Sequence, residues 1–578
     1  MINATLAPPD TQDVADPERD ARSASPLSRR AMLATTTAAL ATAACAPAGG
    51  GKPVPSTTAP PAPTTPPTVP PTTAAPTTTI PAGPVTPTPP GGEGVTTRIA
   101  IDKLTFGPAP GLAAAIEARG VWSWIDDQLN PVARNVPDAE WRLAGYATLT
   151  NTHRQNFDVQ DSDDGWYRLI EELDHATVQR AVYSQRQLYE LMCDFWSNHF
   201  NTWRQKTWML FLKNRSNETV IRANALGKFS TMLLASARDS AMLDYLDNLP
   251  SDASSPGGVN ENYARELMEL HSLGIVNGVQ THTEADVRGV AKVISGWSIN
   301  WDDNATRYDF RFLPWQHSLD AVTVLGGAFS RPARTYGQGY DDGVRLIDVL
   351  AHHPATARHI AWKLCKRFVS DTPSEALIAS TAAVFTANDT AIAPTLRHIF
   401  SSPEFAAGHK RKVRRPFEVL VGALRATGAA IPLGWNTQTT DKVRDMLDNL
   451  GQPLYERHSP DGYPDVNAFW LSSEGFLQRW AMLGRLARNK LTDPTQPNPI
   501  VVNLPSLLPS PQPPTVAALI RWLAENLGNY TMSDADVADL CSACAFTATA
   551  AGTTVSGDAN KLSLAVGLVL SHPSFQQR

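Results

Sequence analysis

The sequence has few cysteines and no apolar run long enough to cross a membrane. Five cysteines are spread over 578 residues. Cys541 and Cys544 form one Cys-x-x-Cys pair without the second pair that a zinc site needs. Cys193 and Cys365 lie in apolar helical patterns, which are typical of buried, inert thiols. The sequence leaves the disulfide state of these four cysteines open.

The sequence also lacks a strong charge and the familiar catalytic motifs. Its net charge is only -6, without the clustered basic surface that a nucleic-acid-binding protein needs, so nucleic acid is not an expected partner. There is no Gly-x-Ser-x-Gly nucleophile motif, no His-Glu-x-x-His metal motif, no P-loop and no clear Rossmann fingerprint. We therefore expect no cofactor and no metal.

An export signal is present at the N-terminus. Arg29 and Arg30 precede a short uncharged apolar stretch, residues 34–44, and small residues lead to Cys45. This order is typical of a signal peptide of the twin-arginine (Tat) route. Ala43 and Ala44 before Cys45 resemble a lipobox, although Thr42 replaces the usual aliphatic residue. We expect residues 1–45 to be the signal, Cys45 to carry lipid, and the mature protein to be anchored at the cell surface or in the periplasm.

Residues 46–94 are nearly all Pro, Thr, Ala, Gly and Val. Such a segment buries too little apolar surface to offset its ordering entropy. We interpret it as a disordered, semi-rigid linker, which at ~3.1 Å per residue would reach on the order of 100 Å or more.

Residues 95–578 carry the pattern of a large, mainly α-helical domain. Apolar residues recur at helical spacing in many segments, for example at Leu188, Leu191, Met192 and Phe195. A proline-rich stretch at residues 493–514 is a candidate subdomain break. One region alternates instead: Tyr308, Phe310 and Phe312, and then Val322 and Val324, predict a small inserted β-hairpin, with strand limited to residues 307–325.

Several motifs in this domain are specific enough to indicate a family. Residues 194–200 read Asp-Phe-Trp-Ser-Asn-His-Phe, and residues 260–271 read Asn-Glu-Asn-Tyr-Ala-Arg-Glu-Leu-Met-Glu-Leu-His. Together with blocks at 286–297, 353–357, 415–418 and 451–453, they resemble the DUF1800 family of bacterial proteins of unknown function. The resemblance begins near Thr97 and runs to the C-terminus. It implies a large, exported, mainly helical domain and supplies no reaction.

One block departs from the family pattern. The family often has an adjacent His-Asp pair followed by Gly and Lys, whereas this chain has His317, then Asp320, and no Lys before Gly326. A role carried by that pair in the family does not transfer to this chain.

The motif at 260–271 supplies the strongest catalytic candidates. Glu261, Arg265 and Glu269 share one helix face at i, i+4 and i+8, and Glu266 lies on an adjacent one. Paired carboxylates are what general acid/base catalysis needs. The alternative is a solvated face held by i,i+4 ion pairs, each worth about 0.2–0.5 kcal/mol.

His199 and His271 are the second set of catalytic candidates. Each falls on the apolar stripe of a helix, where a lone histidine is usually a hydrogen-bonded core residue. Their places in two motif blocks suggest a shared polar pocket, and a two-histidine metal site with Asp286 is the weaker alternative. On a regular helix, however, Glu266 and Glu269 point ~140–200° away from His271.

Aromatic and basic segments complete the candidate site. The aromatic residues between Trp297 and Trp315 either stack on sugar rings or pack a hairpin on helices. The basic run from Lys410 to Arg415 precedes a helix N-terminus, where cations oppose the dipole, so it either answers acids in the domain or on a ligand, or is a solvated loop. The candidates for substrate binding are Asn198, Asn260, Arg265, Asp286, Trp297 and Arg415.

Two functions fit these observations. The first is an envelope-anchored hydrolase-like enzyme that acts on an extracellular polymer such as polysaccharide, with Glu261, Glu266 or Glu269 as acid/base. The second is a non-catalytic cell-envelope protein that binds or scaffolds a partner. An enzyme should gather the motif carboxylates and histidines in one concave pocket. A scaffold should close them in internal ion pairs.

Overall fold

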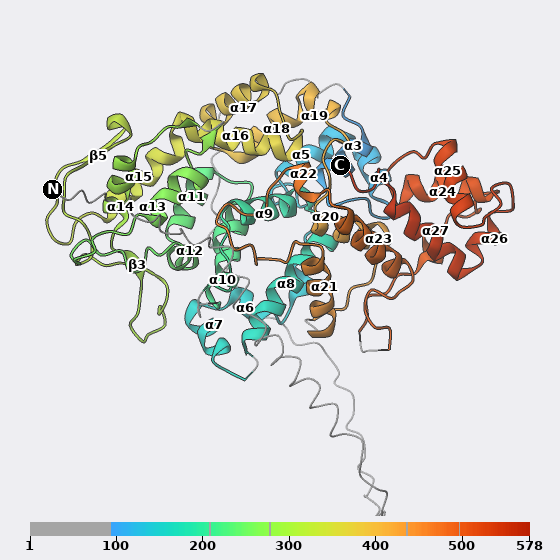
Figure 1. Ribbon diagram of the computed structural model, residues 1–578, viewed down its shortest axis with the longest axis horizontal. Coiled ribbons are helices and arrows are strands. Elements are labelled where there is room, and N and C mark those ends of the chain that lie inside the picture. The colour runs from blue at the N-terminus through green and yellow to red at the C-terminus, as the bar shows by residue number, and fades with distance from the viewer. Residues whose placement is uncertain (1–93, 164, 207–209, 277–278, 435–436, 496–497) are drawn as a thin grey trace, which may run out of the picture. The chain divides into compact units, whose positions relative to one another are not determined.

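Helices dominate the described part of the chain. The computed structural model describes residues 94–163, 165–206, 210–276, 279–434, 437–495 and 498–578. The expected signal and Cys45 lie outside the described residues, as does the expected linker except for Gly94. The mainly α fold is confirmed (Figure 1). The α-helices of the first part are α3 (Thr97–Leu104), α4 (Leu112–Arg119), α5 (Val121–Leu129), α6 (Ala147–Thr150), α7 (His153–Gln160), α8 (Gly165–Tyr183), α9 (Gln187–His199), α10 (Leu212–Ser216), α11 (Phe229–Ala237), α12 (Ser240–Tyr245), α13 (Asn262–Glu266) and α14 (Glu284–Ile294).

Further α-helices follow from residue 340 onward. They are α15 (Tyr340–His352), α16 (Pro354–Phe368), α17 (Glu375–Ala387), α18 (Ile392–Phe400), α19 (Pro403–Ala407), α20 (Pro416–Ala426), α21 (Thr437–Asn449), α22 (Asn467–Trp470), α23 (Ser473–Ala487), α24 (Val516–Asn526), α25 (Asp534–Ala543), α26 (Thr553–Ser556) and α27 (Ala559–Ser571). No helix of the described ranges is both long and apolar enough to span a bilayer.

Helix boundaries follow the expected capping chemistry. Thr283 and Asp286 form a capping box at the start of α14, in the spacing typical of a helix N-terminus. Pro354 opens α16 and Pro416 opens α20, where the missing N–H of proline costs no helical hydrogen bond.

Short strands lie between α13 and α15. The strand β3 (Trp297–Ile299) pairs antiparallel with β4 (Phe310–Phe312), and β5 (Val322–Val324) pairs with β6 (Phe329–Arg331). A third pair joins β1 (Ile275–Val276) to β2 (Val279–Gln280). The two alternating segments therefore belong to two different hairpins, and strand extends beyond residues 307–325. Period two marks strands but does not say which strands pair.

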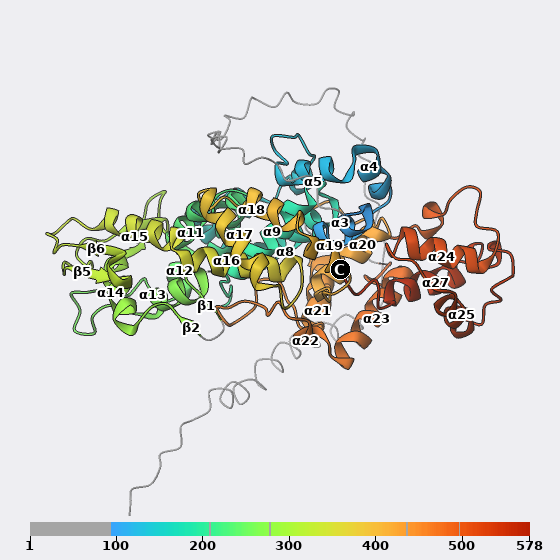
Figure 2. The ribbon, with the colours of Figure 1, turned by 90° about the horizontal axis from the view of Figure 1, so that it is seen from above.

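The described helices bury two large hydrophobic cores. The first is built from elements between α3 and α19. The second joins α8 to α20, α21 and the helices from α23 to α27, and it includes Ile500, Val502 and Leu504 of the proline-rich stretch. In Figures 1 and 2, α24 to α27 lie together on the far side of α20 and α23 from the hairpins.

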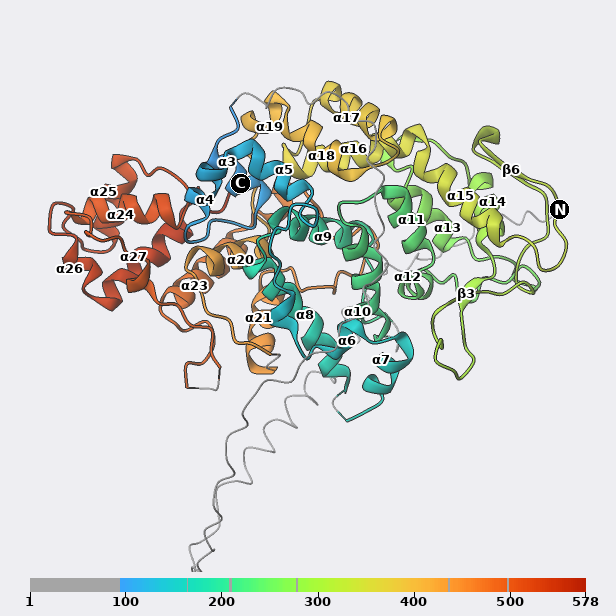
Figure 3. The same cartoon turned by 180° about the vertical axis from the view of Figure 1, so that it is seen from behind.

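Helix α9 lies where the two cores meet. Its Leu188, Met192 and Trp196 pack into the first core, whereas Leu191 packs into the second. Seen from behind in Figure 3, α9 lies among α5, α10 and α20. The motif at 194–200 thus lies at the end of a helix that packs into both cores. This packing fixes the positions of the polar residues of the motif.

Candidate functional site

The two predicted histidines come together at the end of α9. His199 and His271 are buried, with ring centroids 6.1 Å apart. Nε2–H of His199 donates to the carbonyl oxygen of His271 at 3.2 Å. Neither ring nitrogen of His271 has a hydrogen-bond partner among the described residues. The shared pocket that the motifs suggest is therefore a packed contact between two helix ends.

Helix α16 adds two residues that the sequence analysis missed. His359 lies 6.2 Å from His199 between ring centroids, and its Nδ1–H donates to the carbonyl oxygen of Ser272 at 2.8 Å. Lys363 Nζ lies 2.8 Å from Nδ1 of His199. The two residues are i and i+4 on α16, and that spacing is the signal in the sequence that places them on one helix face.

Burial keeps the three histidines of this cluster uncharged. Burial, and then the positive charge of Lys363, lower the pKa of His271 to about 3 and that of His359 to about 4. The same two causes hold the pKa of His199 well below its usual range. Burial also lowers the pKa of Lys363 to about 8, against the attraction of Asp465 and Asp461.

The acidic motif helix changes its geometry midway. Helix α13 ends at Glu266 and continues as a π-helix, η4 (Leu267–His271). In a π turn the backbone bonds join residues i and i+5, so the angle expected between Glu266 and His271 for a regular α-helix does not apply. A π turn of this kind is frequent at functional sites.

The motif carboxylates Glu261 and Glu269 face Arg265 on the helix surface. Each lies 3.7 Å from the guanidinium group of Arg265. That group makes a two-pronged contact with Glu284 of α14, at 2.7 Å for both bonds. Arg265 thus joins α13 to α14, and the i,i+4 ion pairs of the structural alternative are present.

Glu266 differs from its neighbours. It is half-buried, and no hydrogen bond or ion pair to its carboxylate is found among the described residues. Burial and the charge of Glu269 raise its pKa, against the opposing effect of Arg265, and Asp461 adds to the rise. Of the three motif glutamates, Glu266 has the environment closest to that of a general acid.

Three of the candidates for substrate binding make hydrogen bonds or packing contacts within the fold. Asn260 Oδ1 accepts from the N–H of Asn262, the first residue of α13, at 2.8 Å. Asp286 accepts from the backbone of Thr283 and, at 2.6 Å, from the N–H of Leu325. Trp297 is fully buried under the β3–β4 hairpin against Phe310.

Arg415 and the basic run before it pair with acids inside the domain. Arg415 contacts Asp194 of α9, which links the second core to the first. Lys412 lies 2.6 Å from Asp371, and Arg414 lies 2.8 Å from the buried carboxylate of Asp102. The basic run therefore pairs with acids inside the domain, rather than forming a solvated loop.

Glu418, in the first turn of α20, completes this internal ion network. It lies 2.6 Å from Arg367 of α16. Burial alone would raise its pKa, but the neighbouring guanidinium groups, first that of Arg367, hold it well below the usual range.

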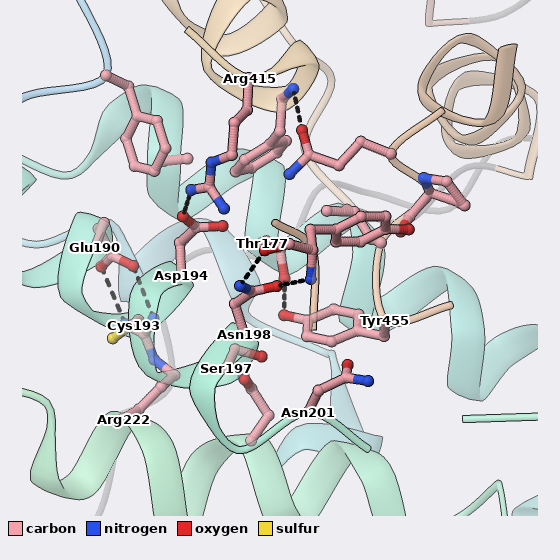
Figure 4. A pocket seen from close by; sticks show the side chains of 18 residues that line it. Thr177, Glu190, Cys193, Asp194, Ser197, Asn198, Asn201, Arg222, Arg415 and Tyr455 are labelled. Carbon is pink, nitrogen blue, oxygen red and sulfur yellow. Dashed lines mark hydrogen bonds and ion pairs between the residues drawn. The ribbon is translucent and has the colours of Figure 1, made fainter. Parts of the chain in front are cut away.

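Asn198 and Arg415 line a small cavity beside α9 (Figure 4), and none of the histidines lines it. Its volume is about 70 Å³. Asn198 bonds both backbone groups of Tyr463, donating at 2.9 Å and accepting at 2.7 Å. Thr177 and Tyr455 share a bond of 2.8 Å. A space of this size holds a few waters, whereas ligand pockets usually measure ~300–1,000 Å³.

A second cavity, of about 280 Å³, is lined by arginines and acids that pair with one another. Arg180 lies 2.6 Å from Glu218 and 2.7 Å from Glu140, and Arg222 lies 2.7 Å from Glu190. The charged groups of this cavity are therefore already neutralised within the protein.

The predicted site residues thus fall into separate places. The structure brings together His199 and His271, and separately Glu261, Arg265 and Glu269. Asn198 and Arg415 share a cavity, while Asp286 and Trp297 serve the hairpin region. Within the described ranges, no group of three or more His, Cys, Asp or Glu is arranged to hold a metal ion.

The family model described as "Protein of unknown function (DUF1800)" matches residues 99–577. No curated protein and no solved structure matches the chain. The match covers nearly all of the described residues, including both cores, the histidine cluster and the acidic motif helix. The chain therefore belongs to the DUF1800 family of proteins of unknown function.

Proposed function

We propose that this protein is an exported, lipid-anchored component of the cell envelope that binds an extracellular polysaccharide without cleaving it. Export and anchoring rest on the Arg29-Arg30 pair, the apolar stretch at 34–44 and Cys45. The linker at 46–94 would let the domain reach its ligand at a distance from the membrane.

The observation that carries the binding function is that most of the motif residues already pair with other groups of the protein. Arg265 holds Glu261, Glu269 and Glu284 together, and His199 is bonded on both ring nitrogens. These contacts connect residues of helices α9, α13, α14 and α16. This is the arrangement expected of a scaffold rather than of an acid/base pair.

The ligand class is suggested by two exposed tryptophans of the hairpin region. Trp301 follows β3 and is 47% exposed, and Trp315 follows β4 and is 51% exposed. The register of the hairpin puts them at its opposite ends. Exposed aromatic rings present flat apolar faces beside polar groups, which suits stacking against sugar rings. The other aromatic residues of the segment pack into the fold.

A hydrolase-like enzyme is the second candidate, and Glu266 favours it. Its half-buried carboxylate has a raised pKa and a second acid, Asp461, nearby. Those are the properties of a general acid in polymer hydrolysis.

One experiment separates the two functions. Each variant is measured for binding to, and release of fragments from, a panel of envelope polysaccharides, beside its melting temperature. Binding without cleavage, weakened in Trp301→Ala and Trp315→Ala but not in Trp141→Ala, supports the proposal. Trp141 is a matched control because it is 67% exposed elsewhere in the domain.

The enzyme candidate makes the opposite prediction. Fragment release by the unsubstituted protein, lost by about 10²-fold or more in a stable Glu266→Gln variant and retained in Glu284→Gln, would replace the proposed function. Failure of every polysaccharide to bind would contradict the ligand class.

A further inference from the structure

An apolar ridge lies on α22 and α23. Its members are Phe469, Leu471, Leu477 and Trp480, which are 47%, 51%, 62% and 45% exposed. They are four of the fourteen exposed large hydrophobic side chains of the described residues, gathered in one twelve-residue window. No other window of that length in the described ranges holds more than two. Exposed apolar side chains that cluster in this way are typical of an interaction site.

Two contacts with the rest of the domain fix the aromatic rings of the ridge. The indole N–H of Trp480 donates to the carbonyl oxygen of Ser571 at 3.0 Å, which fixes the ring on the end of α27. Phe469 packs edge-on against the buried Trp470, with ring centroids 4.7 Å apart. Because these rings are already fixed, docking them costs little side-chain entropy.

The ridge lies in a segment of the chain whose charges are nearly all positive. Between residues 467 and 490, Glu474 is the single acid, whereas Arg485, Arg488 and Lys490 are exposed at the end of α23. Exposed Arg411 lies at the other end, where its carbonyl oxygen accepts from the side chain of Asn467 at 2.7 Å. This basic rim stands out in a chain of net charge -6.

We propose that the ridge on α22 and α23 docks the folded domain on an anionic lipid bilayer. Tryptophan, phenylalanine and leucine side chains enter the boundary between headgroups and acyl chains, and the basic rim faces anionic headgroups. Basic charge with almost no acid favours a lipid surface over a polysaccharide or a second copy of this acidic chain. The docking is separate from the proposed polysaccharide binding and does not depend on lipid at Cys45.

The test uses the full chain with Cys45→Ser, so that no lipid anchor contributes. An environment-sensitive fluorophore is attached at Leu477→Cys or, as a matched control, at Tyr336→Cys, which is 69% exposed in the hairpin region. Each is mixed with vesicles of phosphatidylcholine alone or with about one-third phosphatidylglycerol, and the chain without an added cysteine is the labelling blank. Any vesicle binding through residues 31–44 is common to both labelled proteins.

We expect a blue shift of emission at position 477 with the anionic vesicles, weakened by salt, and none at position 336. Charge reversal in Arg488→Glu with Lys490→Glu should raise the lipid needed for a half-maximal shift by about tenfold or more. The same reversal at Lys442 and Lys561, both exposed, should leave it unchanged.

Three results would overturn the proposal: no shift at position 477, equal shifts at the two positions, or equal effects of the two charge reversals. Self-association that Leu477→Glu abolishes, without vesicle binding, would assign the ridge to a second copy of the chain instead.

Discussion

Lys363 Nζ donates a hydrogen bond of 2.8 Å to Nδ1 of His199, whose Nε2–H in turn donates to the backbone of His271. The imidazole of His199 is therefore held neutral between an ammonium group and a carbonyl oxygen. Protonating it would put two positive charges in contact in a buried place.

The domain should lose stability as the pH falls below about 6.5. His199, His271 and His359 have folded pKa values below their unfolded value, so below pH 6.5 the unfolded chain takes up protons that the folded chain refuses. As the pH falls from about 6.5 toward its folded pKa, each histidine lowers the free energy of unfolding by ~1.4 kcal/mol per pH unit. Urea unfolding at pH 7 and pH 5 should differ by on the order of 5 kcal/mol. His359→Gln should reduce the pH slope by about one proton, and an unchanged slope in that variant would contradict the assignment.

Glu418→Gln should destabilise the protein strongly, and Glu284→Gln should not. The Glu418 carboxylate is buried and pairs with Arg367. Removing its charge leaves a buried cation uncompensated, which lowers the free energy of unfolding by about 3–5 kcal/mol. Glu284 pairs with Arg265 at the surface, where such pairs contribute little. Thermal unfolding of both variants measures the difference, and equal melting temperatures would count against the internal network.

Gly274→Ala should cost more than Gly337→Ala. Both glycines have positive φ, +76° and +86°, a conformation that costs an alanine ~1–2 kcal/mol. At Gly274, a Cβ would also lie 2.4 Å from the ring of His359, whereas nothing lies within 4 Å of one at Gly337. Overpacking adds ~1–3 kcal/mol, so the melting temperature should fall further for Gly274→Ala. Similar melting temperatures would mean that His359 moves aside freely.

Replacing Arg29 and Arg30 by Lys should block export, because the Tat route depends on the arginine pair. Cys45→Ala should instead leave export intact and release the protein from membranes. Fractionation of cells into cytoplasm, membrane and soluble exported protein measures both. Detergent-independent solubility of the unsubstituted mature protein would refute the lipid anchor.

Much of the fold follows from local patterns in the sequence. Thr283 with Asp286, Pro354 and Pro416 each mark a helix start through backbone chemistry that needs no distant partner. Strand pairing is different, since Phe310 pairs with Ile299 rather than with the next alternating segment. Alternation fixes the face of a strand, and only tertiary packing chooses its neighbour.

The site was harder to predict for the same reason. The motifs point to His199 and His271, but burial and the charge of Lys363, 164 residues from His199, together lower the pKa of that ring. The partners of Arg265 likewise include Glu284, on a different helix. A pattern along one helix identifies a polar face, while the groups that occupy it come from elsewhere in the chain.

The pairing of residues 412–414 with residues 576–578 affects the order in which the chain can be completed. Lys412 and Arg578 exchange backbone hydrogen bonds, Arg414 donates to the carbonyl oxygen of Gln576, and the side chain of Arg578 reaches Glu418. During synthesis the ribosome must add about 160 further residues after Glu418 before these contacts can form. A contact between residues so far apart in the sequence forms late. In a nascent chain whose synthesis stalls within α27, residues 412–414 would therefore still lack their backbone hydrogen bonds to residues 576–578.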